Sequence, residues 1–178
     1  FEHAHQAADI AIQAIELLHA CGRERDAAAI AEGAIQVNPN DPRLRAYAGM
    51  LDIQLGEFQR ARAHYLVALE HAPQACEWQL PHGLALMQRY NDARHPDFAR
   101  FHDYLERADI SDKARSALLF ALAKAHDDIG DFAHAAAYSR QANTLANKLT
   151  QWSRKQWRRA IEARLDAHST GPGLPQQA

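Results

Sequence analysis

The sequence PRLRAYAGMLDIQLGEFQRARAHYLVALEHAPQA, residues 42–75, contains two alanine- and leucine-rich patterns in succession. Gly56 separates the two patterns, and the second pattern ends just before Pro73. Glycine accepts the left-handed backbone that closes a helix, whereas proline cannot continue a helix because it lacks an N–H and clashes with the preceding turn. The segment therefore predicts two helices joined by a tight turn.

The same markers recur along the chain at fixed intervals. The pairs spaced by 34 residues are Gly22–Gly56, Ala27–Ala61, Ala34–Ala68 and Pro39–Pro73. The pairs spaced by 74 residues are Gly56–Gly130, Phe58–Phe132, Ala61–Ala135 and Ala68–Ala142. Small residues recur where two helices cross, because longer side chains would push the backbones apart. The intervals predict repeats at about 8–41, 42–75, 76–115 and 116–149, and the third repeat is degenerate and carries six extra residues.

The predicted fold class is all-α, an α-α superhelix of about four helix pairs plus a C-terminal capping helix. One pair cannot bury its own apolar face, so several must stack into one core. The expected helices span about His5–Ala20, Arg23–Val37, Arg43–Leu55, Phe58–His71, Glu77–Arg89, Asp97–Ala108, Lys113–Ile129, Phe132–Asn147 and Gln151–His168. Because Pro81 falls inside the fifth helix, we expect a kink or a late start there.

Residues 1–168 are expected to form one superhelical domain, with residues 169–178 as a flexible tail or linker. The tail contains Gly171, Pro172 and Gly173, which disfavour regular structure. In the last helix, residues 151–168, the side chains of Trp152, Trp157 and Ile161 are spaced to cover the apolar face of the final repeat. This helix is therefore expected to cap the array.

The repeat resembles the tetratricopeptide (TPR) consensus, which has a small residue, a glycine turn, two alanines and a closing proline at fixed offsets. The resemblance implies a scaffold that binds another polypeptide in a concave groove lined by the first helix of each pair. The groove residues implied by the 34-residue frame are Ile12, Glu16, Met50, Ile53, Gln54, Leu80, Leu84, Met87, Phe120, Lys124 and Asp127. Flexible methionines suit such a surface. The alternative is that the capping helix or a bulge of the degenerate repeat fills the groove.

Chaperone-adaptor TPR domains hold a C-terminal carboxylate with Lys, Asn and Arg on the same face. Ile12 and Glu16 occupy matching positions here, so the resemblance implies no such carboxylate clamp.

No catalytic or metal-binding constellation is predicted. The two cysteines, Cys21 and Cys76, are too far apart in sequence for a Cys-x-x-Cys site and favour a reducing, cytoplasmic setting. Asp127 and Asp128 are adjacent helical residues whose side chains point about 100° apart, so they cannot converge on one substrate atom. Of the eleven histidines, His126 occupies a position where the TPR consensus prefers a packing aromatic. We therefore expect a structural histidine there, no metal site, no cofactor and no enzymatic activity from this chain.

The charge is unevenly distributed. Residues 148–178 carry six Lys/Arg against two acids, whereas the whole chain has a formal charge of -2. Such a basic helix could bind nucleic acid or a membrane surface. We expect instead the solvated outer face of a terminal helix, with neither nucleic acid nor membrane as partner.

A narrower resemblance covers about residues 96–148. The motif LFALAKAHDDIGDF, residues 119–132, followed by Gln141-Ala142-Asn143, is similar to the region that joins the TPR array to the enzyme domain in bacterial TPR-sulfotransferase proteins. The family's Pro-Arg-Ser-Gly-Thr donor loop is absent from these 178 residues. The resemblance implies, as the alternative function, the accessory N-terminal half of a sulfotransferase. Its partner would then be an intramolecular catalytic domain after Ala178.

Overall fold

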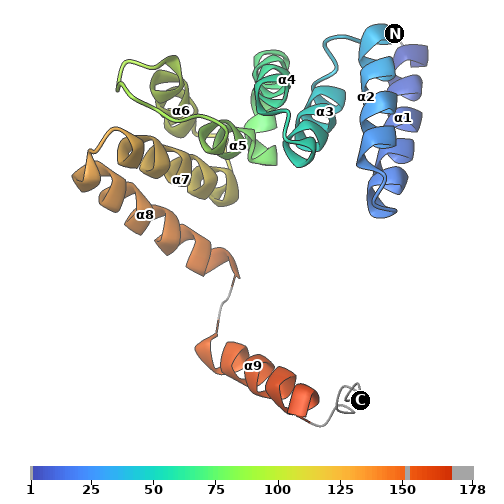
Figure 1. Cartoon of the computed structure of the whole chain (residues 1–178). Coiled ribbons are helices and arrows are strands. Elements are labelled where there is room, and N and C mark those ends of the chain that lie inside the picture. Colours follow the sequence, from blue (N-terminus) through green and yellow to red (C-terminus); the bar gives the residue numbers. More distant parts are fainter. Residues whose placement is uncertain (1, 151–152, 170–178) are drawn as a thin grey trace, which may run out of the picture.

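The computed structural model describes residues 2–150 and 153–169, and within these ranges all regular elements are helices (Figure 1). The α-helices are α1 Glu2–Ala20, α2 Glu24–Val37, α3 Pro42–Leu55, α4 Phe58–His71, α5 Leu80–Leu86, α6 Pro96–Glu106, α7 Asp112–Asp128, α8 Phe132–Thr150 and α9 Arg154–Ser169. A short 3₁₀ helix, η1, spans Pro73–Trp78. The prediction of an all-α repeat fold is confirmed.

Consecutive helices pack as pairs, and the pairs follow one another in a curved row (Figure 1). The most extensive pairings are α1 with α2, α3 with α4, and α7 with α8. In the degenerate repeat, α5 and α6 both pack against α7. Packing of both helices on α7 therefore connects the degenerate repeat to the last helix pair of the row.

Three turns between paired helices share one backbone geometry. Gly22, Gly56 and Gly130 have φ angles of 69°, 82° and 79°, in the left-handed region that glycine tolerates best. The residue after each glycine donates its N–H to the carbonyl five residues earlier: Arg23 to Leu18 (2.9 Å), Glu57 to Asp52 (2.8 Å) and Asp131 to His126 (2.9 Å). Each glycine also donates its own N–H to the carbonyl three residues earlier. The two hydrogen bonds cap the first helix of the pair, and they confirm the glycine turns expected from the sequence.

The degenerate repeat differs from the predicted single helix at Glu77–Arg89. The chain instead forms η1, passes through Gln79 with a φ of 62°, and then starts the seven-residue α5. Pro81 lies in the first turn of α5, where its missing N–H costs nothing, so the late start expected from proline is confirmed.

A buried carboxylate fixes the irregular segment that follows α5. Asp97 is fully buried, and its oxygens accept hydrogen bonds from Tyr90 (2.8 Å) and Arg100 (2.6 Å). Arg62 of α4 completes the network with an N···O distance of 2.7 Å. The network ties α6 to α4, because each charged group would be unstable in the core without its partners.

The buried apolar side chains form two cores. The N-terminal core runs from Ala8 to Leu51 in α1, α2 and α3, and the C-terminal core runs from Tyr65 to Ala125 in α4 to α7. Polar groups add to the packing of α3 against α4: Arg60 binds the buried Asp52 through two nitrogens. His64 lies 3.6 Å from Asp52 and 3.3 Å from Glu32. We call this group of four residues the polar seam.

The predicted capping role of the last helix is not observed. Helix α9 forms, but it makes no extensive contact with another described element and stands apart from α8 in Figure 1. The side chains of Trp157 and Leu165 are 57% and 64% exposed. The physical reason is composition: only a narrow stripe of apolar residues interrupts a helix that carries five Lys/Arg. Trp152 and the tail from residue 170 lie outside the described residues.

Candidate functional site

A mostly apolar pocket lies where three successive first helices, α1, α3 and α5, face one another. It has a volume of about 460 Å³ and is lined by side chains from α1, α3, α4, η1 and α5. The lining residues are Ile12, Arg43, Ala46, Tyr47, Met50, Tyr65, Trp78 and Leu80. We call this the groove pocket.

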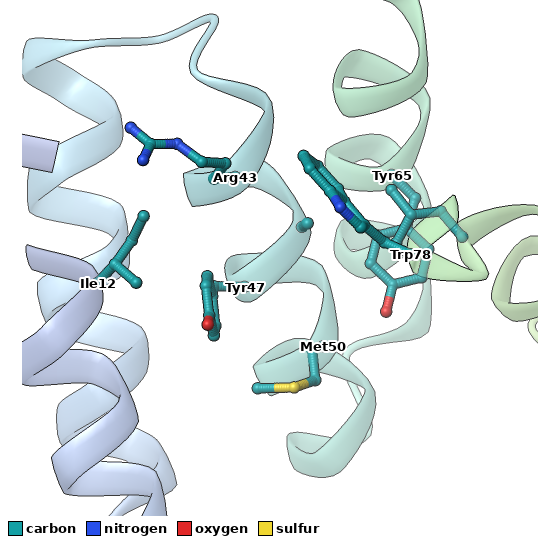
Figure 2. A pocket seen from close by; sticks show the side chains of 8 residues that line it. Ile12, Arg43, Tyr47, Met50, Tyr65 and Trp78 are labelled. Atoms are coloured by element: carbon teal, nitrogen blue, oxygen red, sulfur yellow. The ribbon is translucent and has the colours of Figure 1, made fainter. Parts of the chain in front are cut away.

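The walls of the groove pocket are mostly apolar. Ile12 on α1 faces Tyr47 and Met50 on α3, and Trp78 approaches from the other side of the space (Figure 2). The Trp78 side chain remains 41% exposed although it is large and aromatic. An exposed tryptophan at the edge of an apolar pocket is typical of a recognition surface, because aromatic anchors supply large contact area.

The rim of the groove pocket is polar and acidic. Arg43 donates hydrogen bonds to Asp9 on α1 (2.6 Å) and to Asp41 (3.2 Å). The hydroxyl of Tyr47 donates a hydrogen bond to Glu16, and burial together with this bond raises the pKa of Tyr47 to about 12. Two carboxylates pair with the Arg43 guanidinium and a third accepts from Tyr47, so these groups together carry a net negative charge.

Three of the predicted groove residues meet in this pocket: Ile12, Met50 and Leu80. Glu16 lies beside them through its bond to Tyr47. Gln54 is exposed in the last turn of α3, and the structure gives it no role in the pocket.

The other apolar residues predicted for the groove belong to the core. Leu84 is completely buried, so its predicted place on a binding surface is wrong. Ile53 and Met87 are partly buried and pack against the C-terminal core. For Met87, at the end of α5, the reason is that α5 is short and starts late, which brings its residues onto α7.

The last three predicted residues, Phe120, Lys124 and Asp127, line a second pocket of about 480 Å³ between α7 and α8. Lys124 is already engaged there. Its ammonium group donates to the carbonyl of Gln88 and to Asp128, and it lies 5.2 Å from the centre of the Tyr90 ring. These contacts fix the loop after α5, so Lys124 supports the fold in addition to lining a pocket.

The 34-residue frame also maps Arg43 and Ala46 to the groove face, but it misses three residues of the groove pocket: Tyr47, Tyr65 and Trp78. Tyr65 lies on α4, a second helix of a pair and so outside the frame of first-helix positions, although it lines the pocket. Tyr47 lies one position beyond Ala46 in the groove frame, and Trp78 lies in the 3₁₀ turn of the degenerate repeat. The available signal for Trp78 was its size and its place at the start of the helix expected at Glu77–Arg89.

No protein-family model matches the chain, and no curated protein sequence matches it. The geometry of the pockets is therefore the basis for any functional conclusion.

Within the described ranges, no helix combines the length and the apolar character needed to cross a bilayer.

Proposed function

We propose that the chain is a non-catalytic scaffold of the TPR type that binds another polypeptide through the groove pocket. The observation that carries the proposal is the apolar pocket of about 460 Å³ with the half-exposed Trp78 at its edge. A volume of this size accommodates one or two bulky side chains of a peptide. The surrounding first helices supply the concave surface along which the rest of the peptide would lie.

The acidic rim defines the chemistry of the partner. Asp9, Asp41 and Glu16 outnumber the single guanidinium of Arg43, and Asp9 and Glu16 lie on the same helix as Ile12. Complementary charge steers encounter and excludes partners of like charge. We therefore expect a peptide with an aromatic or branched aliphatic residue next to Lys or Arg. Because Cys21 and Cys76 are free thiols, we place this binding in the cytoplasm.

A peptide-display selection against the intact chain tests the proposal, followed by affinity measurement on one selected peptide. Trp78→Ala should weaken binding about thirtyfold, as expected for a buried aromatic anchor worth about 2 kcal/mol. Phe58→Ala is the matched control, because Phe58 is 50% exposed and lies outside the pocket lining. Glu16→Gln should reduce the preference for a basic residue.

Circular dichroism and melting of each variant ensure that the fold is kept. If Trp78→Ala and Met50→Ser bind as well as the wild type, the groove pocket is not the binding site. Loss of binding on Phe120→Ser instead would assign the function to the pocket between α7 and α8.

A further inference from the structure

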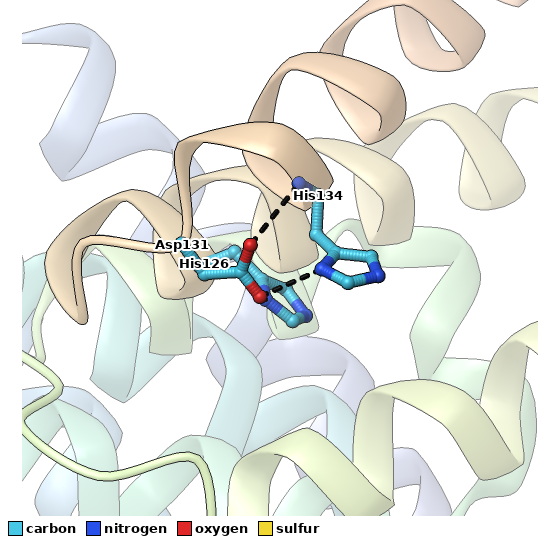
Figure 3. A group of neighbouring side chains, drawn as sticks. All are labelled: His126, Asp131 and His134. Carbon is cyan, nitrogen blue, oxygen red and sulfur yellow. Dashed lines mark hydrogen bonds and ion pairs between the residues drawn. The ribbon is translucent and has the colours of Figure 1, made fainter.

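The turn between α7 and α8 brings three side chains with metal-ligating atoms together (Figure 3). Nδ1 of His126, at the end of α7, lies 3.1 Å from Oδ2 of Asp131. Nδ1 of His134, in the first turn of α8, lies 2.7 Å from the same oxygen. All three candidate ligand atoms lie within 4.8 Å of one another. Two imidazoles and one carboxylate therefore converge on a single point.

The equivalent turn of the second repeat contains an ion pair in place of the two histidines. A shift of 74 residues places Asp52 and Arg60 at the positions of His126 and His134. There the turn holds a positive charge, because the Arg60 guanidinium binds the Asp52 carboxylate. The repeat frame therefore brings the side chains at these two positions within contact distance. In the second repeat one of them, Arg60, carries a positive charge.

The fourth repeat has no arginine or lysine at this turn; instead, Nδ1 of His126 and Nδ1 of His134 both contact Asp131. In the part of the chain that the structure describes, the ion pairs of Asp131 are with the two histidines alone. Lys124, the nearest lysine in the same helix, is directed to Asp128. The second repeat therefore places arginine at this turn, whereas the fourth places imidazole, a side chain that can ligate a metal ion from solution.

Two of the three side chains are held in place by the fold. The His126 ring packs edge-on against Phe98 at 5.2 Å and lies 5.4 Å from the Tyr138 ring. Asp131 is fixed because its N–H bonds to the His126 carbonyl and its Oδ1 accepts from the His134 N–H at 3.3 Å. The His134 side chain is 64% exposed, so it can adjust. Prepositioned ligands of this kind lower the cost of binding an ion.

We propose that His126, Asp131 and His134 form a binding site for a divalent transition-metal ion of the zinc class. Imidazole and carboxylate ligands suit Zn²⁺, whereas Mg²⁺ and Ca²⁺ prefer oxygen ligands throughout. Tetrahedral Zn²⁺ keeps neighbouring ligand atoms roughly 3.3–3.6 Å apart, so the exposed His134 ring would retreat by about half an ångström. Water would fill the fourth position.

The other cluster of this kind does not carry the same inference. Glu32, Asp52 and His64 also lie close together. The Arg60 guanidinium already occupies that cluster, and Arg45 contacts His64 at 3.0 Å. A second cation there would meet two arginines, so the proposal is confined to the turn between α7 and α8.

Calorimetric titration of the chelator-treated, full-length chain with ZnCl₂ tests the site, with Co²⁺ as a spectroscopic probe. One equivalent of Zn²⁺ should bind, and Co²⁺ should show the intense visible bands of four-coordinate geometry. His134→Ala and Asp131→Asn should each weaken Zn²⁺ binding by about tenfold or more, at least as much as loss of an outer-shell partner. Because His134 is exposed and Asn can still cap α8, both variants should keep the wild-type circular dichroism spectrum.

The double variant His3→Ala/His5→Ala is the control, because these two residues are the most closely spaced histidines in the sequence. It should bind one Zn²⁺ as the wild type does. The proposal is wrong if this control loses the ion, if His134→Ala retains wild-type affinity, or if millimolar Zn²⁺ produces no heat of binding.

Discussion

The ring of Tyr65 occupies the space that a side chain at Gly83 would need. A β-carbon added to Gly83 would lie 2.6 Å from Cε2 of Tyr65, closer than real β-carbons approach other atoms. Gly49 faces the same ring from α3, and a β-carbon there would overlap it as well. One tyrosine on α4 is thus enclosed by glycines of two first helices, and this close packing joins the second repeat to the degenerate one.

Gly49→Ala should destabilise the chain by about 1–3 kcal/mol, because the new methyl group overpacks against Tyr65 and lies 3.1 Å from the Ala61 carbonyl oxygen. Gly33→Ala is the matched control. It lies in α2 with no atom within 4 Å of the new β-carbon, so better helix propensity should stabilise it by about 0.5–1 kcal/mol. Denaturant midpoints measure both changes. Equal shifts in one direction would contradict the packing assigned to Tyr65.

Arg60→Met should lower the free energy of unfolding by about 1–3 kcal/mol, because the buried Asp52 carboxylate loses its bidentate partner. The control is Arg23→Met, which removes an exposed i,i+3 pair with Asp26 and should cost no more than about 0.5 kcal/mol. Urea unfolding at pH 7 compares the two variants. A loss for Arg60→Met no larger than the control would show that the polar seam does not stabilise the fold.

Stability should decline at acidic pH partly through Asp41, the N-cap of α3. Burial of this carboxyl opposes ionisation, but hydrogen bonds from Arg43 and from the Leu44 and Arg43 N–H groups hold its pKa below the ordinary value of 3.8. Its stabilising contribution is therefore complete above about pH 3.8 and is lost as the pH falls through the lower folded-state pKa. Asp41→Asn should keep the N-cap of α3, but the free energy of unfolding of this variant should decrease less as the pH falls. Unfolding free energies of both proteins between pH 7 and pH 2 should converge at the acidic end.

Truncation after Thr150 should leave the melting temperature of the repeats nearly unchanged, because α9 exposes Trp157 and Leu165 and makes no extensive contact with the array. Thermal melts followed at 222 nm compare the truncated and full-length chains by their midpoints. A drop of many degrees, or aggregation of the truncated chain, would mean that α9 packs on α8 in solution, as its tryptophan spacing predicts.

The repeat architecture was predictable because its signals are local. Gly22, Gly56 and Gly130 each sit at a turn whose backbone requires a positive φ, and no distant contact is needed to recognise them. The helix expected at Glu77–Arg89 was wrong in form because the chain around Pro81 is decided by packing against α7.

The sites were only partly predictable. A 34-residue frame located Ile12, Met50 and Leu80 because regular repeats place equivalent positions on equivalent surfaces. It failed for Leu84, whose environment depends on how the degenerate repeat folds. The cluster of His126, Asp131 and His134 spans nine residues, and its convergence depends on side-chain rotamers at a capped turn, which no spacing rule specifies.

The two apolar cores form neighbouring units of the repeat array, and the groove pocket lies across both. Ile12, Arg43 and Met50 reach the groove pocket from helices of the N-terminal core, whereas Tyr65 and Leu80 reach it from the C-terminal core. Nearest-neighbour coupling across one such interface permits the first three helices to open while the remainder stays folded. A peptide seated in the pocket contacts both units, so it must raise the cost of separating them. Hydrogen exchange in α1 and α2 would then slow on binding, although most of their amides lie far from the peptide.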